Sequence, residues 1–231
     1  RRRLLFCVPF VSGPWQTNCY VVAANKPTHA ERQPAFVIDA GVDTRPHVEE
    51  ILTQYRFDLA AVVCSHGHVD HVADAAQLAD DHQVPLWLHP ADLAMLTNPA
   101  LGLGPGSEIL IRQVLGSTRL PAPVDLRELA DGQCLESAGV TLEVIHAPGH
   151  TPGCVVLLGD DDGSPGVFSR DVLFAGSVGR TDLPGGDTDT LIASITQRLW
   201  PMGDDTVFIP GHGPESSFGR ERRFNPYLSG T

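Results

Sequence analysis

The chain has 231 residues, of which 42% are apolar and 19% are charged, and this composition excludes a disordered or fibrous protein. Its 16 basic and 28 acidic side chains give a formal net charge of −12, so the average surface would repel nucleic acids and anionic membranes. No apolar run approaches the roughly 20 residues that cross a bilayer, and no signal-peptide pattern is visible. The five cysteines form no C-x-x-C motif, which predicts reduced thiols and a cytoplasmic protein.

The first 64 residues predict three strands, a helix and a fourth strand. The strands are expected at Leu4 to Val11, Cys19 to Ala24 and Ala35 to Ile38, between turn-rich stretches. Apolar residues from 48 to 55 then follow the period of a helix. The continuous apolar run from Leu59 to Cys64 has the length of a buried strand.

The middle of the chain predicts another helix and strand before a long loop. The helix is expected from about Asp70 to Asp81, and the strand from Leu86 to Leu88. Residues 97–123 are rich in Gly and Pro without a clean period, so we expect a long loop that flanks a site.

The remaining chain predicts four strands and a helix. These elements are Val140 to Ile145, Cys154 to Leu158, Val167 to Phe168, a helix from about Thr188 to Leu199, and Val207 to Ile209. The chain thus begins with strands and continues with alternating strands and helices. A second group of strands then follows, and after it a helix and a final strand. Two packed sheets with helices outside explain this order better than one doubly wound parallel sheet.

The clearest candidate site follows the fourth predicted strand, where four residues of metal-ligand type occupy six positions. His66 and His68 are two residues apart, so their side chains leave an extended loop on the same side. Asp70 and His71 fall in the first turn of the next helix and can point to a second centre. Imidazole and carboxylate ligands suit Zn²⁺, and also Fe²⁺ or Mn²⁺. A motif of this kind, taken alone, also fits a solvated histidine-rich turn.

Three later strands end in tight turns that each carry one further candidate ligand. These ligands are His150, Asp171 and His212. Each would be an ordinary turn residue by itself. Four strand ends that all carry ligands are best explained by convergence on one pocket.

With these motifs the chain resembles a metallo-β-lactamase-fold hydrolase of the small type related to glyoxalase II (hydroxyacylglutathione hydrolase). Further matching sequences are T-N-C-Y at 17–20, G-R-T-D at 179–182 and E-R-R-F-N-P at 221–226. The resemblance implies an α/β (α+β) fold, built as a four-layer αββα sandwich. It also implies that residues 1–231 form a single domain with a short C-terminal tail and no separate C-terminal helical domain. It is less specific for the substrate, because this fold hosts several reactions.

The resemblance implies two divalent metal ions, zinc in the first place and iron or manganese as alternatives. Their ligands would be His66, His68 and His150 on the first metal, Asp70, His71 and His212 on the second, and Asp171 between them. Asp70 and Asp171 are therefore also the expected catalytic residues. The expected substrate is a small acyl thioester, such as S-2-hydroxyacylglutathione or a related thiol conjugate, attacked by a metal-bridging hydroxide. No nucleic-acid or membrane partner is expected, and the oligomeric state stays open.

Three features depart from the glyoxalase II pattern. The bridging Asp171 follows Arg170, where the family normally has glycine, so this long cation either shapes the pocket or points outward. Arg180 and Asp182 stand where a Lys and a Tyr hold glutathione in the family. Arg180 is expected to bind a substrate carboxylate, with a structural turn residue as the equal alternative. Only 19 residues (231 − 212) follow His212, so recognition of glutathione itself has little support.

The same candidate ligands are compatible with other functions. A persulfide dioxygenase would hold a single iron at His66, His150 and Asp171. A non-catalytic metal-binding protein would have kept the ligands and lost turnover through Arg170. A β-lactamase fits less well, because its typical ligands would require a Cys or Asn in the motifs and an export signal would be expected. A nuclease of this fold would need a large inserted domain and a basic surface.

The remaining histidines and two cysteines near the motifs are not expected to take part in catalysis. Cys64 and Cys154 have no obvious paired base, so a covalent acyl-enzyme is not expected. Five histidines match no ligand position and should be surface or packing residues: His29, His47, His82, His89 and His146.

Overall fold

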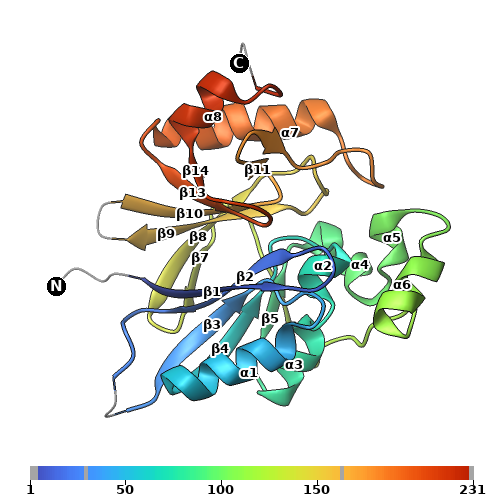
Figure 1. Cartoon of the computed structure of the whole chain (residues 1–231), viewed down its shortest axis with the longest axis vertical. Helices are drawn as coiled ribbons and strands as arrows, with labels where there is room; N and C mark the ends of the chain where they lie inside the picture. Colours follow the sequence, from blue (N-terminus) through green and yellow to red (C-terminus); the bar gives the residue numbers. More distant parts are fainter. Residues whose placement is uncertain (1–4, 29–30, 162–163, 229–231) are drawn as a thin grey trace.

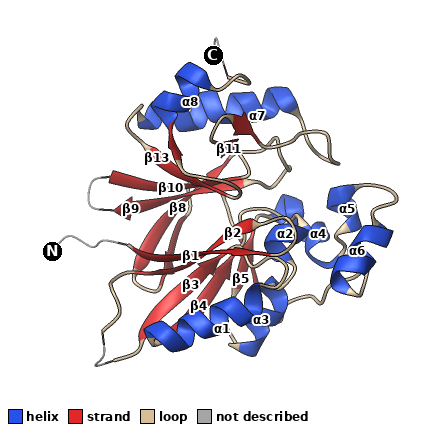
Figure 2. Cartoon of the chain, in the orientation of Figure 1, coloured by secondary structure: helices blue, strands red, loops and turns tan. Residues whose placement is uncertain are grey.

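Two six-stranded sheets lie face to face through the middle of the structure, and helices cover both outer faces (Figure 1, Figure 2). The structure is a computed structural model that describes residues 5–28, 31–161 and 164–228. Helix, sheet, sheet and helix form four layers, which confirms the expected αββα sandwich. The single domain over residues 1–231 stays a prediction.

The first sheet is antiparallel at one side and parallel at the other. Its strand order is β1 (Phe6–Ser12), β2 (Thr17–Ala23), β3 (Gln33–Ile38), β4 (Phe57–Val63), β5 (Leu86–Leu88) and β6 (Leu126–Glu128). Strands β1 to β3 are antiparallel, whereas β3 to β6 are parallel because helical connections return the chain to the same end of the sheet. Helices α1 (Thr44–Tyr55) and α3 (Ala75–Asp81) cover its outer face (Figure 1).

Side chains along the central strands alternate between two hydrophobic cores. Val37 and Val62 belong to the core under α1 and α3, whereas Phe36 and Val63 belong to the core between the two sheets. A strand with both faces buried needs apolar residues at every position. The continuous apolar run before residue 64 therefore follows from its central place in the fold.

The second sheet is mainly antiparallel and carries the C-terminal helices. Its strand order is β14 (Ser216–Ser217), β13 (Val207–Pro210), β10 (Ser164–Arg170), β9 (Val155–Asp161), β8 (Val140–His146) and β7 (Cys134–Ser137). Helix α7 (Thr188–Ser194) and helix α8 (Phe218–Phe224) cover its outer face (Figure 1). A separate hairpin of β11 (Leu173–Phe174) and β12 (Ser177–Val178) follows β10.

Residues 97–123 do not form the expected long loop. Three short helices fold in or beside this segment: α4 (Leu93–Thr97), α5 (Ala100–Leu103) and α6 (Glu108–Leu115). Gly104 and Gly116 end α5 and α6 with φ angles of 90° and 72°, which glycine adopts without strain. Two of the four glycines that suggested a loop are therefore helix ends.

The helix expected from about Asp70 to Asp81 is divided into α2 (Val69–Val72) and α3. Between them, the backbone N–H of Asp74 donates to the Ala40 carbonyl (3.0 Å), and the Asp74 carboxylate accepts from the Arg45 N–H (3.0 Å). These bonds tie the chain to the segment after β3 and turn it there. The helix expected up to Leu199 similarly changes into a π-helical turn at Ile195–Leu199.

The helices carry no sign of a membrane segment. Within the described residues, no helix combines the length and the apolar character that crossing a bilayer requires.

Candidate metal centre

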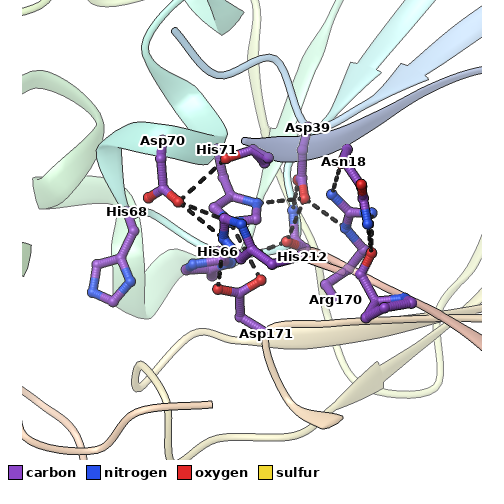
Figure 3. Close-up of polar contacts among 12 residues, drawn as sticks. Asn18, Asp39, His66, His68, Asp70, His71, Arg170, Asp171 and His212 are labelled. Atoms are coloured by element: carbon purple, nitrogen blue, oxygen red, sulfur yellow. Dashed lines mark hydrogen bonds and ion pairs between the residues drawn. The ribbon is translucent and has the colours of Figure 1, made fainter. Parts of the chain in front are cut away.

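All seven expected ligands lie together where strands of both sheets end, and all of them except His150 are labelled in Figure 3. The segment from His66 to His71 follows β4 of the first sheet. His150 follows β8, Asp171 follows β10 and His212 follows β13, all in the second sheet. The expected convergence on one pocket is therefore present in the structure.

The ligand atoms form three overlapping groups, each with its atoms within 4.8 Å of one another. The groups are His66, His68 and His150; His66, His71 and Asp171; and Asp70, His71 and His212. They overlap because neighbouring groups share a histidine. This chain of donors matches two adjacent metal positions rather than a single isolated one.

Asp171 lies between the two ends of the cluster. Its Oδ2 is 3.6 Å from His150 Nε2 and 3.5 Å from His212 Nε2, and its Oδ1 is 3.3 Å from His71 Nε2. Asp70 Oδ2 lies 3.4 Å from His71 Nε2 and 3.2 Å from His212 Nε2. The position of Asp171 is the one expected of a bridging carboxylate.

Several of these atoms are buried and make no hydrogen bond to the described residues. They are Nε2 of His66 and His71, and Oδ1 of Asp171, whereas His68 faces the cluster with its Nδ1, which lies 2.9 Å from His150 Nε2. An unpaired polar atom in the protein interior is costly, so such atoms need a partner. Nitrogen and carboxylate donors in this arrangement fit divalent zinc, iron or manganese.

At the end of the cluster that holds His71 and His212, the two acids raise the pKa values of the histidines. Burial lowers the pKa of His71, but Asp171 and Asp70 outweigh burial and hold it well above the ordinary value. Asp171 and Asp70 likewise outweigh burial at His212 and raise its pKa to about 9. Burial raises the pKa of both carboxyls, but the neighbouring histidines hold it well below the ordinary value.

At the other end of the cluster, the pKa values of two histidines are lowered instead of raised. Burial lowers the pKa of His66 well below its ordinary value, and the nearby histidines add to the effect. Burial and the neighbouring His150 lower the pKa of His68 to about 3. These two imidazoles are therefore neutral at pH 7, the state that binds a metal.

Asp39 anchors the ligand loops from behind, and the sequence analysis did not single it out. It directly follows β3, is completely buried and has a left-handed backbone with φ of 58°. Its carboxylate accepts hydrogen bonds from Ser65 N (2.7 Å), Ser65 Oγ (2.9 Å), His71 Nδ1 (2.8 Å) and Arg170 Nε (2.7 Å). The bond from Nδ1 fixes the tautomer of His71 and turns its Nε2 toward the other ligands.

Asp92 is a second buried acid that the sequence analysis missed. It accepts from Gly67 N (2.9 Å), Thr151 Oγ1 (2.6 Å) and Gly153 N (2.7 Å). It thus joins the loop that carries His66 and His68 to the loop that carries His150. A Cβ on Gly153 would lie 2.6 Å from Asp92 Cγ, so the close approach requires glycine there.

Arg180 contributes to the site first through its backbone. Its carbonyl accepts a hydrogen bond from His150 Nδ1 (2.8 Å), which directs Nε2 of that histidine into the cluster, where it lies 2.9 Å from His68 Nδ1. Its guanidinium forms a bidentate ion pair with Asp182, with both N–O distances at 2.7 Å. Contact between Arg180 and a substrate stays a prediction.

Arg170 does not point outward. Its side chain is fully buried behind the ligands, and it contacts Asp39 rather than the cavity. Asp171, the next residue, still reaches both ends of the ligand cluster.

A cavity of about 290 Å³ opens over the ligands. Its other walls are mainly apolar and consist of Trp15, Leu103, Phe174, Val178 and Leu183, with Arg180 at one side. A second cavity of about 500 Å³ is lined by residues that include Gly104 and Pro184, which directly follow Leu103 and Leu183 in the sequence.

The remaining histidines of the described chain make packing or surface contacts, as expected. His47 packs on Phe10, and His82 pairs with Glu49 (2.7 Å). His89 stacks on His146 with 4.2 Å between ring centroids. His29 lies outside the described residues.

Cys64 and Cys154 are unsuited to nucleophilic catalysis. Both are fully buried, and burial raises the pKa of each thiol well above its ordinary value. A thiol that stays protonated is a poor nucleophile. This agrees with the expectation that no covalent acyl-enzyme forms.

Known proteins share both the sequence pattern and the fold. The sequence model of the Metallo-beta-lactamase superfamily matches residues 12–212. Hydroxyacylglutathione hydrolase GloC of Haemophilus influenzae is 31% identical over 222 residues, which cover 93% of this chain and 94% of that protein.

Solved structures of other proteins are similar to this chain in fold. The BLEG-1 B3 metallo-beta-lactamase has a TM-score of 0.79 and 32% identity, with 98% of this chain and 100% of that chain covered. TTHA1623, solved in a di-iron-bound form, has a TM-score of 0.74 and 35% identity, with 96% and 100% covered. ETHE1 from Myxococcus xanthus has a TM-score of 0.72 and 20% identity over 96% and 83%, and shows the fold alone.

Proposed function

The chain belongs to the metallo-β-lactamase superfamily, and we propose that it is a binuclear metal-dependent thioesterase of the glyoxalase II type. The observation that carries the proposal is the cluster of seven nitrogen and oxygen donors, bridged by Asp171, beneath a mainly apolar cavity. The similarity to hydroxyacylglutathione hydrolase GloC supports the choice of thioester substrates. His66 and His68, which are neutral, and the ionised acids already have the ligand states that divalent metals require, whereas His71 and His212 would release a proton on metal binding.

His66, His68 and His150 would hold the first metal, and Asp70, His71 and His212 the second, with Asp171 between them. The metals would supply Lewis acidity and lower the pKa of bound water from its much higher bulk value to about 7. Zinc is our first choice, and the di-iron form of TTHA1623 supports iron as the alternative.

The cavity walls suggest how the substrate lies. Trp15, Phe174 and Leu183 offer apolar surface to the acyl group and exclude water from the reacting bond. We place the thiol carrier in the second cavity, where Thr118 and Arg119 offer polar contacts. S-2-hydroxyacylglutathione and thioesters of related thiols both have this two-part form.

Thiol release from a panel of acyl thioesters tests the proposal, with elemental analysis of the same samples. The metal-loaded protein should hydrolyse at least one thioester, and the protein from which a chelator has removed the metal should not. Asp171→Ala should lose most of the activity and metal, because the bridge between the two positions is gone, while the exposed Asp189→Ala serves as the matched control. Full activity of the chelated protein, or of Asp171→Ala, would rule the mechanism out.

β-Lactam hydrolysis is a second candidate, because BLEG-1 is similar over the whole chain. The sequence alone argued against a β-lactamase, since no Cys or Asn replaces a ligand in the motifs. A chromogenic cephalosporin, assayed beside the thioesters, decides between the two. Higher kcat/KM for the cephalosporin would replace the thioesterase proposal.

Persulfide dioxygenation stays a less favoured alternative. The likeness to ETHE1 shows the fold and not the activity. Iron content near one atom per chain, together with oxygen consumption on a glutathione persulfide, would favour it.

A further inference from the structure

Arg170 is a fully buried cation in a backbone conformation that suits glycine. It ends β10 with φ of 48°, at a shift in register between β10 and β13. A non-glycine residue is disfavoured there, and burial of a guanidinium is costly unless it is paired. The surroundings must therefore compensate for both.

The guanidinium is held on all sides. Its Nε donates to Asp39 Oδ2 (2.7 Å), its NH1 to the Pro210 carbonyl (3.4 Å) and its NH2 to the Asn18 carbonyl (Figure 3). It also lies over the Tyr20 ring, with 5.3 Å from Cζ to the ring centroid. Such a set of contacts fixes the carboxylate of Asp39 in one orientation.

These contacts lead to the ligands of the second metal position. Asp39 accepts from His71 Nδ1 (2.8 Å). Asn18 binds the loop around His212, through its N–H to the Gly211 carbonyl (2.7 Å) and its Nδ2 to the Gly213 carbonyl (2.9 Å). Asp171 is the next residue in the chain.

Ligands of the first position are held mainly by other groups. The loops of His68 and His150 meet at Asp92, and His150 donates to the Arg180 carbonyl. His66 is linked to Asp39 less directly, through the Ser65 hydroxyl (3.0 Å). Loss of Arg170 should therefore act unequally on the two positions.

We infer that Arg170 is a positioning residue that sets the affinity of the second metal position by holding Asp39, and through it His71, beside the His212 loop. The inference rests on the proposed binuclear site. It gives the residue that departs from the family glycine a specific role in metal binding.

Metal titration of the chelated protein tests the inference. In Arg170→Gly, the second metal should bind about 10- to 100-fold more weakly, as is typical when a partner of a ligand is removed. The first metal should keep its affinity, so the metal content after gel filtration should fall from two to about one per chain. If Arg170→Gly binds both metals as tightly as the wild type does, or loses the same affinity at both positions, the inference is overturned.

Arg222→Gly is the matched control. Arg222 also lies over an aromatic ring, 5.2 Å from the centroid of Trp200, and pairs with Asp204 (2.9 Å) away from the ligands. It should keep both metals. If Arg170→Gly does not fold, Arg170→Lys carries the same test, because one ammonium group cannot reproduce all three donor contacts.

A double-mutant cycle separates positioning through Asp39 from a general structural role. In Asp39→Asn, the further change Arg170→Gly should weaken the second metal less than it does in the wild type. Full additivity would contradict the inference. A wild type that binds two metals but cleaves no thioester would refute the proposed function and leave this inference standing.

Discussion

At the scale of single residues, chemistry that lies in a local motif was predictable and chemistry that depends on distant partners was not. The ligand positions follow from side-chain type and spacing within a few residues. Asp39 has no such signal except that an acid directly follows a buried apolar strand. Its partner Arg170 is 131 positions away, and only the fold brings the two together.

The exposed ion pair of Arg180 and Asp182 leads to a prediction about substrate binding. Arg180→Ala should raise KM for a carboxylate-bearing thioester about two- to fivefold, the size of an exposed ion pair, and change kcat less. The backbone carbonyl that orients His150 is unaffected by this change. Initial-rate kinetics provide the measurement.

Asp182→Asn is the matched variant for that experiment. It releases the Arg180 guanidinium from its bidentate partner, so KM for the same substrate should fall. An unchanged KM in both variants would leave Arg180 as a structural turn residue.

The different pKa shifts at the two ends of the cluster predict different pH dependence of metal affinity. His212, with its pKa raised to about 9, carries a proton at pH 7 that a metal must displace. The affinity of the second position should therefore rise from pH 7 to about 9, by up to about tenfold per pH unit for each displaced proton. His66 and His68 are already neutral over this range, so the first position should change less.

Competition with a chelator at several pH values measures both affinities. His82→Gln is a suitable control, because this histidine pairs with Glu49 outside the cluster. A steeper pH dependence at the first position would contradict the assignment of charges.

At the scale of elements, long periodic segments and apolar strands were predicted well, down to the three-residue strand Leu86–Leu88, whereas several other short elements were not predicted. The strand before His66 and the helix at Thr44–Tyr55 have clear patterns. Strands of two residues, such as β11 and β14, are too short for any period to show. The glycine-rich segment was misread because glycine ends a helix as readily as it forms a loop.

The β11–β12 hairpin is fastened by the C-terminal helix, and this leads to a prediction. Glu221 of α8 is buried and accepts from Gly176 N (2.7 Å) and Asn225 Nδ2 (2.9 Å). The hairpin carries Phe174 and Val178 into the cavity wall. Glu221→Ala should lower the free energy of unfolding by about 1–3 kcal/mol, because it leaves an N–H of the buried Asn225 amide unpaired.

The same variant should raise KM while both metals are retained, since the hairpin forms a wall and not a ligand. Denaturant unfolding, kinetics and elemental analysis give the three measurements. Glu215→Ala, an exposed position in the same segment, should change none of them. Loss of metal from Glu221→Ala would show that the hairpin supports the ligands as well.

At the scale of the whole molecule, the metal centre joins the two sheets. His66, His68, Asp70 and His71 come from the end of a strand in the first sheet, and the other three ligands come from the second. The sequence order of strands and helices was enough to predict the layers, because each sheet must bury one face on the other and one on helices. It could not show which loops cross between the sheets, since that depends on contacts such as those of Asp92.

Metal removal should therefore lower the stability of the whole folded protein. A ligand that binds only the folded state at 100 times its Kd stabilises it by about 2.7 kcal/mol. For a chain of this size, that corresponds to a fall in Tm of roughly 5–10 °C on chelation. Calorimetry of the metal-free protein with and without added Zn²⁺ measures the difference. Mg²⁺, which prefers all-oxygen sites, is the control cation and should restore little of the loss. Equal melting temperatures with and without Zn²⁺ would mean that the ligands from the two sheets do not share their metals.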